Sequence, residues 1–358
     1  MVEFVRGALG AGHPLEMLGL VGLMVETLLP HEFSYPTDRE HIDPNPGIDA
    51  IASLPFPEYT AALAVFAEIA VGDADLQDRC RKALGLRADT PPQWIVDLPR
   101  LEIYRAVRVT EVLGDRDQVM FGVRLADGHE LTCGVVIDHM GVSTVRDIGL
   151  WPDGLDAIVA QVDRSAGDVD VVDMSLADAR AWIEKGFEFV IFPRFVEKRP
   201  GFHALLRWLT DQLPGGGQPF DRRLQDWRVT AELVDSFFAS PQGTRFDRAE
   251  FGDVLESLMD EGTGDPLRWS VYRITYMFRG FADDDRERSL DTVLRIPALL
   301  RAFIPVAHAR SGIRDELTAR ALAALDDVQT SIEERVRSGL QEYWDRACWS
   351  AANAPSGR

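Results

Sequence analysis

The stretch that decides the fold is residues 101–150, LEIYRAVRVTEVLGDRDQVMFGVRLADGHELTCGVVIDHMGVSTVRDIGL. Apolar and polar residues alternate through much of it, with the period of two that is typical of strands. Gly114–Asp117 predicts a turn, Asp127-Gly128 predicts a hairpin, and Val142–Ile148 fits a fourth strand. The pattern therefore predicts an antiparallel β-meander, with residues 168–172 returning as an edge strand.

Helical patterns flank this sheet on both sides. Residues 14–29 are apolar nearly all round, which predicts a helix buried on several sides, and Pro57–Val71 predicts a second helix. From about residue 200 onwards the period is again 3.6, and Ser331 with Glu334 forms a capping box that predicts a helix start. The predicted fold class is α+β, with a helical amino-terminal segment, a central antiparallel β-meander and a carboxy-terminal helical bundle.

The predicted domains follow these changes of period. They are a helical segment at 1–98, a sheet with flanking helices at 99–192 and a helical bundle at 200–350. The triglycine Gly215-Gly216-Gly217 predicts a linker at 214–218. Whether the two helical ends share one core is left open by the sequence.

The composition is acidic. The 358 residues include 58 acidic and 38 basic residues, a formal charge of -20, which argues against a non-specific grip on nucleic acid or anionic lipid. Divided at the triglycine, the first part has 34 acidic against 19 basic residues and the remainder 24 against 19, so a cationic partner is expected to meet the first part. Only three of the basic residues are lysine, which indicates a GC-rich genome.

The cysteines and the apolar runs predict a cytoplasmic protein. Cys80, Cys133 and Cys348 are too few and too scattered for a disulfide framework. The run Met17–Val25 is nine residues long, which is too short to cross a bilayer. No membrane association is expected.

Standard catalytic signatures are absent, including the P-loop, the GxSxG elbow and the HExxH pair. The pattern most typical of a catalytic site is the apolar strand within Val135–Gly141, which leads into Asp138-His139 and is followed by Asp147. If the flanking strands form a hairpin, Asp138 and Asp147 come close and His139 becomes a general base. A divalent cation, or a splitting of the two carboxyl pKa values, would then be needed at pH 7, as in a metal-assisted hydrolase. The other interpretation is a plain reverse turn.

A second group of possible metal ligands lies in a proline-containing stretch. His31 and His41 are its imidazoles, and with nearby carboxylates they suit zinc or non-haem iron. The carboxylates are Glu32, Asp38, Glu40 and Asp43. A polar surface loop is the alternative, because metal ligands usually come from rigid elements.

One stretch mixes basic and aromatic residues, as single-stranded nucleic-acid sites do. Its basic residues are Arg194, Lys198, Arg199 and Arg207, with Phe202 and Trp208 among the aromatic ones. The alternative interpretation is that these cations balance the acidic segment before them.

Several motifs resemble a pattern found in uncharacterised actinobacterial proteins. The motifs are Asp265–Ser270 (DPLRWS), Ile296–Phe303, the helix His13–Leu20 (HPLEMLGL), the strand Val135–Gly141 (VVIDHMG) and Val145–Leu150 (VRDIGL). The resemblance covers most of the chain and implies a high-GC source. It brings no known activity and no catalytic residues.

Together these features predict a cytoplasmic, non-catalytic interaction or regulatory protein. A protein partner is expected rather than nucleic acid, and no motif implies a cofactor. The alternatives are a metal-assisted hydrolase that uses Asp138, His139 and Asp147, with a divalent metal, and a nucleic-acid-associated regulator. The sequence leaves the partner and the oligomeric state open.

Overall fold

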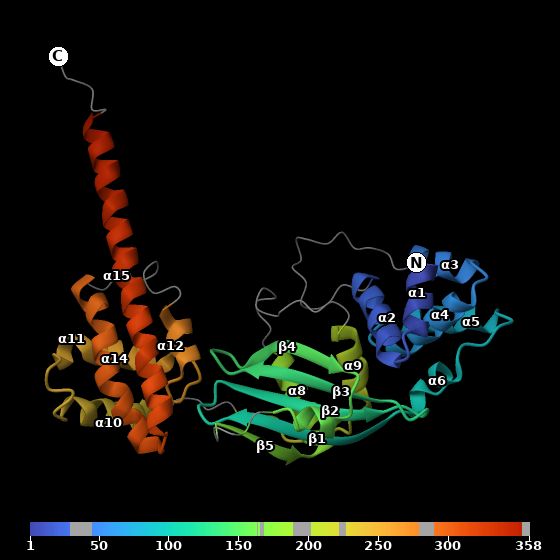
Figure 1. Ribbon diagram of the computed structural model, residues 1–358, viewed down its shortest axis with the longest axis horizontal. Helices are drawn as coiled ribbons and strands as arrows, with labels where there is room; N and C mark the ends of the chain where they lie inside the picture. Colours follow the sequence, from blue (N-terminus) through green and yellow to red (C-terminus); the bar gives the residue numbers. More distant parts are fainter. Residues whose placement is uncertain are drawn as a thin grey trace. The chain divides into compact units, whose positions relative to one another are not determined.

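The computed structural model contains two compact units. Unit 1 comprises residues 1–111, 116–138 and 142–221, and unit 2 comprises residues 112–115, 139–141 and 222–358. The structure describes residues 1–28, 45–162, 164, 168–188, 202–221, 227–278 and 290–352. Along the chain, helices precede an antiparallel sheet and helices follow it, which confirms the predicted α+β class (Figure 1).

A five-stranded antiparallel sheet forms the centre of unit 1 (Figure 1). Its strands are β1 (Glu102–Glu111), β2 (Arg116–Arg124), β3 (Glu130–Asp138), β4 (Thr144–Trp151) and β5 (Val169–Met174). The spatial order is β4-β3-β2-β1-β5, so the first four strands form a meander and the fifth returns to pair with β1. The meander and the edge strand that the alternation predicts are therefore present.

The two faces of this sheet are covered by different helices. The helix α8 (Leu176–Phe187) packs on one face, where Gly186 lets it approach Val145 and Ile137 closely. The short helix α7 (Leu155–Val159) covers part of the opposite face, in a small apolar cluster of its own. The α8 face therefore belongs to the main core of unit 1.

The amino-terminal helices share that main core with the sheet. They are α1 (Val2–Gly10), α2 (Pro14–Leu28), α3 (Asn45–Ser53), α4 (Pro57–Ile69), α5 (Ala74–Gly85), α6 (Gln93–Val96) and the 3-10 turn Leu98–Arg100. Their buried side chains, those of α9 (Phe202–Gln212) and those of the α8 face form one hydrophobic cluster. The helices at 1–98 and the sheet are thus parts of one folded unit.

The segment that contains the triglycine is fastened to α8. A Cβ atom on Gly217 would lie 2.0 Å from the carbonyl oxygen of Ala177, so only glycine fits there. The next residue, Gln218, donates its backbone N–H to Oδ1 of Asp178 at 2.7 Å, and this bond lowers the pKa of that carboxyl. The division between the two units falls a few residues later, after Asp221.

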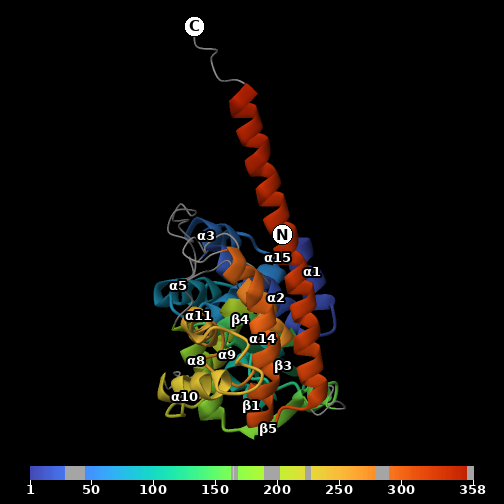
Figure 2. The same ribbon diagram turned by 90° about the vertical axis from the view of Figure 1, so that its left-hand side faces the viewer.

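Unit 2 is built from helices around a second hydrophobic cluster. The helices are α10 (Trp227–Phe238), α11 (Arg248–Asp260), α12 (Val271–Phe278), α14 (Leu290–Ser311) and α15 (Asp315–Ala352). Trp269 and Phe303 are fully buried at its centre, and their rings meet edge to face at 5.9 Å. The helices α14 and α15 lie side by side, and α15 runs back along α14 and continues beyond the first turn of α14 (Figures 1 and 2).

The prediction of a helix start at Ser331 is wrong. Ser331 and Glu334 both lie inside α15, which begins at Asp315. The capping-box letters signal a start only where the preceding residues leave the helix, and here no glycine or proline interrupts the helix between Asp315 and Ser331.

Candidate functional site

Asp138 is held in a buried ion pair. It is the last residue of β3 and is 5% exposed, and its Oδ2 accepts a hydrogen bond from Nη1 of Arg146 at 2.8 Å. The β3–β4 pairing passes over Arg146, which is the extra residue of a β-bulge. Arg146 thus provides the buried carboxylate of Asp138 with a hydrogen-bonded partner where the strand ends.

Asp147 lies on the same face of the sheet as Asp138. It is paired with Val136 on β3, and Asp138 follows Val136 by two residues, so the three share a face. Oδ1 of Asp147 accepts the backbone N–H of Ile148 at 2.8 Å. The strand register thus places the two residues on one face of the sheet.

His139 is anchored through its main chain. Its backbone N–H donates to the carbonyl oxygen of Asp115 at 2.8 Å, and two residues later the N–H of Gly141 donates to the carbonyl oxygen of Gly262 at 2.9 Å. All four residues belong to unit 2, whose segments 112–115 and 139–141 come from the turns after β1 and β3. The VVIDHMG pattern therefore ends in a main-chain junction next to the DPLRWS motif.

The structure assembles no metal-ligand set from the residues it describes. Among them, no group of three or more His, Cys, Asp or Glu side chains is placed to hold a metal ion. That statement covers Asp138, His139 and Asp147. The predicted ligands His31 and His41 lie outside the described residues.

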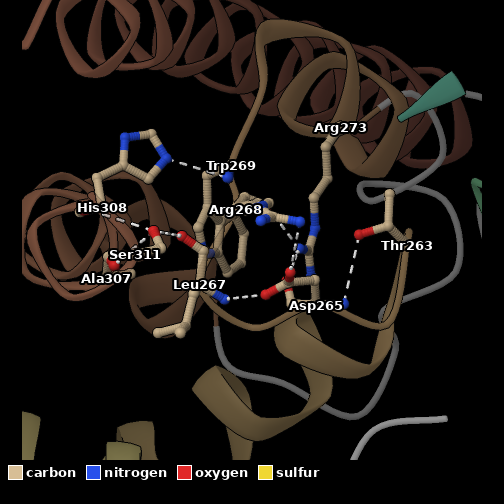
Figure 3. Close-up of polar contacts among 9 residues, drawn as sticks. All are labelled: Thr263, Asp265, Leu267, Arg268, Trp269, Arg273, Ala307, His308 and Ser311. Atoms are coloured by element: carbon tan, nitrogen blue, oxygen red, sulfur yellow. Dashed lines mark hydrogen bonds and ion pairs between the residues drawn. The ribbon is translucent and has the colours of Figure 1, made fainter. Parts of the chain in front are cut away.

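The most developed polar centre was not predicted, and it surrounds Arg273 of α12 (Figure 3). This arginine is fully buried. Its Nη2 donates to the carbonyl oxygens of Leu258 (3.3 Å), Met259 (2.9 Å) and Glu261 (2.7 Å). Its Nη1 donates to those of Asp265 (2.5 Å) and Arg268 (2.9 Å). One guanidinium group thus satisfies the carbonyls that end α11 and those of the following loop.

The environment of Arg273 lowers its pKa without removing its charge at neutral pH. Burial lowers the pKa to about 10, and the nearby carboxylates of Asp115, Asp265 and Glu261 oppose that shift. The ring of Trp269 lies 4.2 Å from the guanidinium carbon and adds a cation–π contact. The centre is therefore a buried cation that backbone carbonyls hold by hydrogen bonds and that three carboxylates face at longer range.

The DPLRWS motif builds the loop around this cation (Figure 3). Oδ1 of Asp265 accepts the backbone N–H of Leu267 at 2.9 Å, and Nε1 of Trp269 donates to the carbonyl oxygen of Pro266 at 2.8 Å. Oγ of Ser270 accepts the N–H of Arg273 at 2.7 Å and so caps the start of α12. The motif thus has a structural role, which accounts for its aspartate, its tryptophan and its serine.

His308 of α14 completes the centre in its neutral form. Its Nε2 accepts the backbone N–H of Trp269 at 3.1 Å, so the proton is on Nδ1, which lies 2.9 Å from Oγ1 of Thr318. The side chain is 1% exposed, and burial lowers its pKa. Both ring nitrogens are therefore engaged, and neither is available as a general acid or base.

Sequence reasoning missed this centre, although one signal was present. Arg273 stands in the apolar helix VYRITYMF, four residues before Met277 and next to Ile274, both of which are buried. A cation on the buried stripe of a helix needs partners, and a loop that ends the preceding helix is the nearest source of carbonyls.

The aromatic residues of the predicted nucleic-acid stretch are placed in or against the core where the structure describes them. Trp208 is 2% exposed, and Phe202 packs against the core of unit 1. The guanidinium of Arg207 lies against Gly72, since a Cβ atom there would be 3.0 Å from it. Arg194, Lys198 and Arg199 lie outside the described residues. Trp208 therefore does not form the surface for stacking nucleic-acid bases that the pattern predicts.

No protein-family model matches the sequence, and no curated protein and no solved structure is significantly similar to it. In the part of the chain that the structure describes, one helix is long and apolar enough to cross a membrane, namely Asp291–Ser311 within α14. Of its most apolar window, 61% is buried inside the protein, as is usual for the core helix of a folded domain. The features of this chain itself therefore carry the functional argument.

Proposed function

We propose that this chain is a cytoplasmic, non-catalytic interaction or regulatory protein that binds a protein partner. The observation that carries the proposal is the engagement of three buried polar side chains by the fold. Arg273 donates to five backbone carbonyls, His308 uses both ring nitrogens, and Asp138 is paired with Arg146. Groups that already hold the backbone are not free to bind and release a substrate.

The uneven charge supports a cationic surface on the partner. Residues 1–214 carry 34 acidic against 19 basic residues, which is most of the net charge of the chain. Opposite charge on a partner steers encounter and disfavours acidic competitors such as nucleic acids. We therefore place the contact on unit 1 rather than on unit 2.

A metal-assisted hydrolase is the second candidate, and one observation favours it. The β3–β4 register brings Asp138 and Asp147 to one face of the sheet, with His139 directly after Asp138. A divalent cation between the carboxyl groups would supply a bound hydroxide. The ion pair between Asp138 and Arg146 weighs against it, because the guanidinium already occupies part of that carboxylate.

Metal binding by the full chain separates the two candidates. The purified protein would be loaded with Zn²⁺, Mn²⁺ or Mg²⁺, dialysed, and analysed for metal by mass spectrometry. We expect well below one equivalent per chain, equal in the wild type, in D138N and in the control D170N, whose Asp170 is an exposed residue of β5. One equivalent in the wild type that disappears in D138N but not in D170N would replace the interaction proposal with the hydrolase.

The partner class has its own test. A single-stranded DNA oligonucleotide labelled with a fluorophore should show no binding near physiological salt, since the net charge repels it. A partner captured from cell extract should be released by about 0.5 M salt, because exposed charges are screened at that ionic strength. Carbodiimide cross-links should join its lysines to carboxylates of unit 1. Tight DNA binding, or cross-links confined to unit 2, would contradict the proposal.

A further inference from the structure

The strand β5 lies at one edge of the central sheet (Figure 1). It pairs with β1 on one side and ends the strand order on the other. In an antiparallel pair, the backbone groups of alternate residues point towards the partner strand, and those of the residues between them point away from it. About half of the residues of β5 therefore direct their N–H and C=O groups away from the sheet.

These outward backbone groups form an open row. In the part of the chain for which the structure gives positions, the only backbone–backbone hydrogen bonds of Val169–Met174 are those of the β1 ladder. Such a row of donors and acceptors is the template to which an extended segment of another protein adds as a strand. The edge of β5 therefore offers a main-chain binding site on unit 1.

The side chains of β5 divide between the two faces of the sheet. Val171 packs against the apolar cluster of α7, whereas Met174 packs against the main core on the α8 face. By alternation, Asp173 lies on the α7 face and Asp170 and Val172 lie on the α8 face. Both aspartates are exposed, and Val172 is 44% exposed. An added strand would therefore meet one exposed apolar side chain and one carboxylate on each face.

The charge along this edge has a single sign. Residues 165–179 include four aspartates and no lysine or arginine. Arg105 of β1 donates to Oδ1 of Asp173 at 2.6 Å and to Oδ1 of Asp156 at 2.5 Å, so one cation serves two carboxylates. Asp170 is exposed on the other face. The edge therefore retains negative charge that an added strand can neutralise.

This charge selects among the segments that could add to the edge. A second copy of β5 would bring further aspartates to it, and like charges on paired strands are destabilising. A strand with Lys or Arg opposite Asp170 and Asp173 gains two favourable pairs, and a β-branched residue opposite Val172 covers its exposed side chain. The chemistry of the edge thus fits an extended basic segment with an apolar residue between its cations.

We propose that the open edge of β5 is the docking site for an extended basic segment of the protein partner, which adds to the sheet as a further strand. In an antiparallel arrangement, the segment reads basic, β-branched, any residue, basic, opposite Asp173, Val172, Val171 and Asp170 in that order. The inference rests on the proposed function, because it names the site and the kind of segment through which unit 1 meets its cationic partner.

A labelled peptide tests the docking edge. A short fluorescein-labelled peptide that contains the sequence KVTK would be titrated with the full chain at low salt, and its anisotropy recorded. We expect saturable binding that D170K weakens about fivefold, since an attraction across the strand pair becomes a repulsion. The matched control is D89K, whose Asp89 is exposed in the loop between α5 and α6. The same charge change there should alter the affinity much less. Equal weakening by D170K and D89K would overturn the inference.

Backbone methylation of the peptide separates strand addition from attraction between charges. Two versions would carry N-methyl groups on alternate residues, so that each version blocks the N–H groups along one side of the extended peptide. Only the version that leaves the β5-facing groups intact should bind, because a strand uses the N–H groups of one side in the new ladder. Equal affinity of the two versions and the unmodified peptide would mean that charge alone holds it, and would overturn the inference.

Amide hydrogen exchange locates the added strand on the protein. At saturating peptide, about half of the amides of Val169–Met174 should exchange more slowly, because they gain acceptors, while those of the core helix α4 should not change. Unchanged exchange throughout β5 with the peptide bound would place the site elsewhere and contradict the inference. The interaction proposal is tested separately, by the metal analysis and by the cross-links to a captured partner, so the failure of one is distinguishable from that of the other.

Discussion

Two arginines, one in each unit, end a helix in the same way. In unit 1, Nη2 of Arg87 donates to the carbonyl oxygens around the end of α3 at Ser53. In unit 2, Nη2 of Arg273 does the same around the end of α11 at Asp260. The carbonyls are those of Ile51, Ala52 and Leu54 in the first case and of Leu258, Met259 and Glu261 in the second. In both helices, the three carbonyls belong to the residues two positions before, one position before and one position after the last helical residue.

The two arginines differ in their surroundings. Arg87 is half-buried, and its Nη1 donates to the carbonyl of the exposed Phe56 and to the hydroxyl of the buried Thr60. Arg273 is fully buried against Trp269. Water can replace a lost bond at Arg87, whereas a carbonyl left unpaired beside Arg273 stays dry. The arginine cap is therefore expected to contribute more to the stability of unit 2 than to that of unit 1.

The largest effect is expected from R273K. A lysine keeps the charge but presents no planar fork, so carbonyls that end α11 lose their donor inside the core. Unfolding of unit 2 should become easier by about 3–5 kcal/mol. The measurement is urea denaturation followed by circular dichroism, with amide exchange within α11 and α12 to assign the loss to unit 2.

The control for R273K is the behaviour of unit 1. Amide protection in its helix α4 should stay at the wild-type level, because Arg273 lies in unit 2. A loss of less than about 1 kcal/mol in R273K would mean that the buried cap is no stronger than an exposed one, and the comparison of the two arginines would fail.

The next effect tests the close approach of Gly262 to Arg273. Gly262 has a φ of +91°, and a Cβ atom there would lie 2.9 Å from Nε of Arg273. Gly128, in the β2–β3 hairpin, has the same φ of +91° and open space around it. G128A should cost about 1–2 kcal/mol for backbone strain alone, and G262A should cost more, about 2–4 kcal/mol. Equal losses in the two variants, measured by urea denaturation, would show that Arg273 yields without cost.

The sheet was predictable from the sequence because its signals are local. Alternation marks each strand, and Gly128 at positive φ gives the hairpin that Asp127-Gly128 predicts. The buried ion pair was not predictable, because Arg146 reaches Asp138 only through the shift of register between Val136 and Ile137. Register depends on contacts between strands, which the spacing along one strand does not encode.

The Arg273 centre was hidden for a different reason. Its hydrogen-bond acceptors are backbone carbonyls from residues 258–268. Every residue has such a carbonyl, so the residue types do not reveal which ones will accept. The DPLRWS letters were visible, but their roles as a turn, an indole contact and a helix cap depend on how the loop folds back on Arg273. The predicted roles of Asp138, His139 and Asp147 in catalysis remain predictions.

A smaller effect is expected from R87K in unit 1. The lysine loses the fork at the end of α3, but solvent reaches this site and compensates in part. The expected loss is about 1–2 kcal/mol, well below that of R273K. Amide exchange within α3 and α4 would detect it directly. A loss as large as that of R273K would mean that burial does not decide the strength of this cap.

The smallest effect concerns His308, which supports the Arg273 loop from α14. Burial lowers its pKa below the ordinary value of 6.5, so between the two values the unfolded chain binds more protons than the folded one. The contribution of this group to stability is therefore complete above about pH 6.5 and is lost as the pH falls below it. The stability of unit 2 should therefore fall between pH 7.5 and pH 5.5. H308Q should lower stability at both pH values but remove this part of the pH dependence, while H129Q should leave it in place. If the urea midpoint of H308Q falls with acid as steeply as that of the wild type, a group other than His308 titrates. That result would also weaken the inference that the surroundings of Arg273 exclude water.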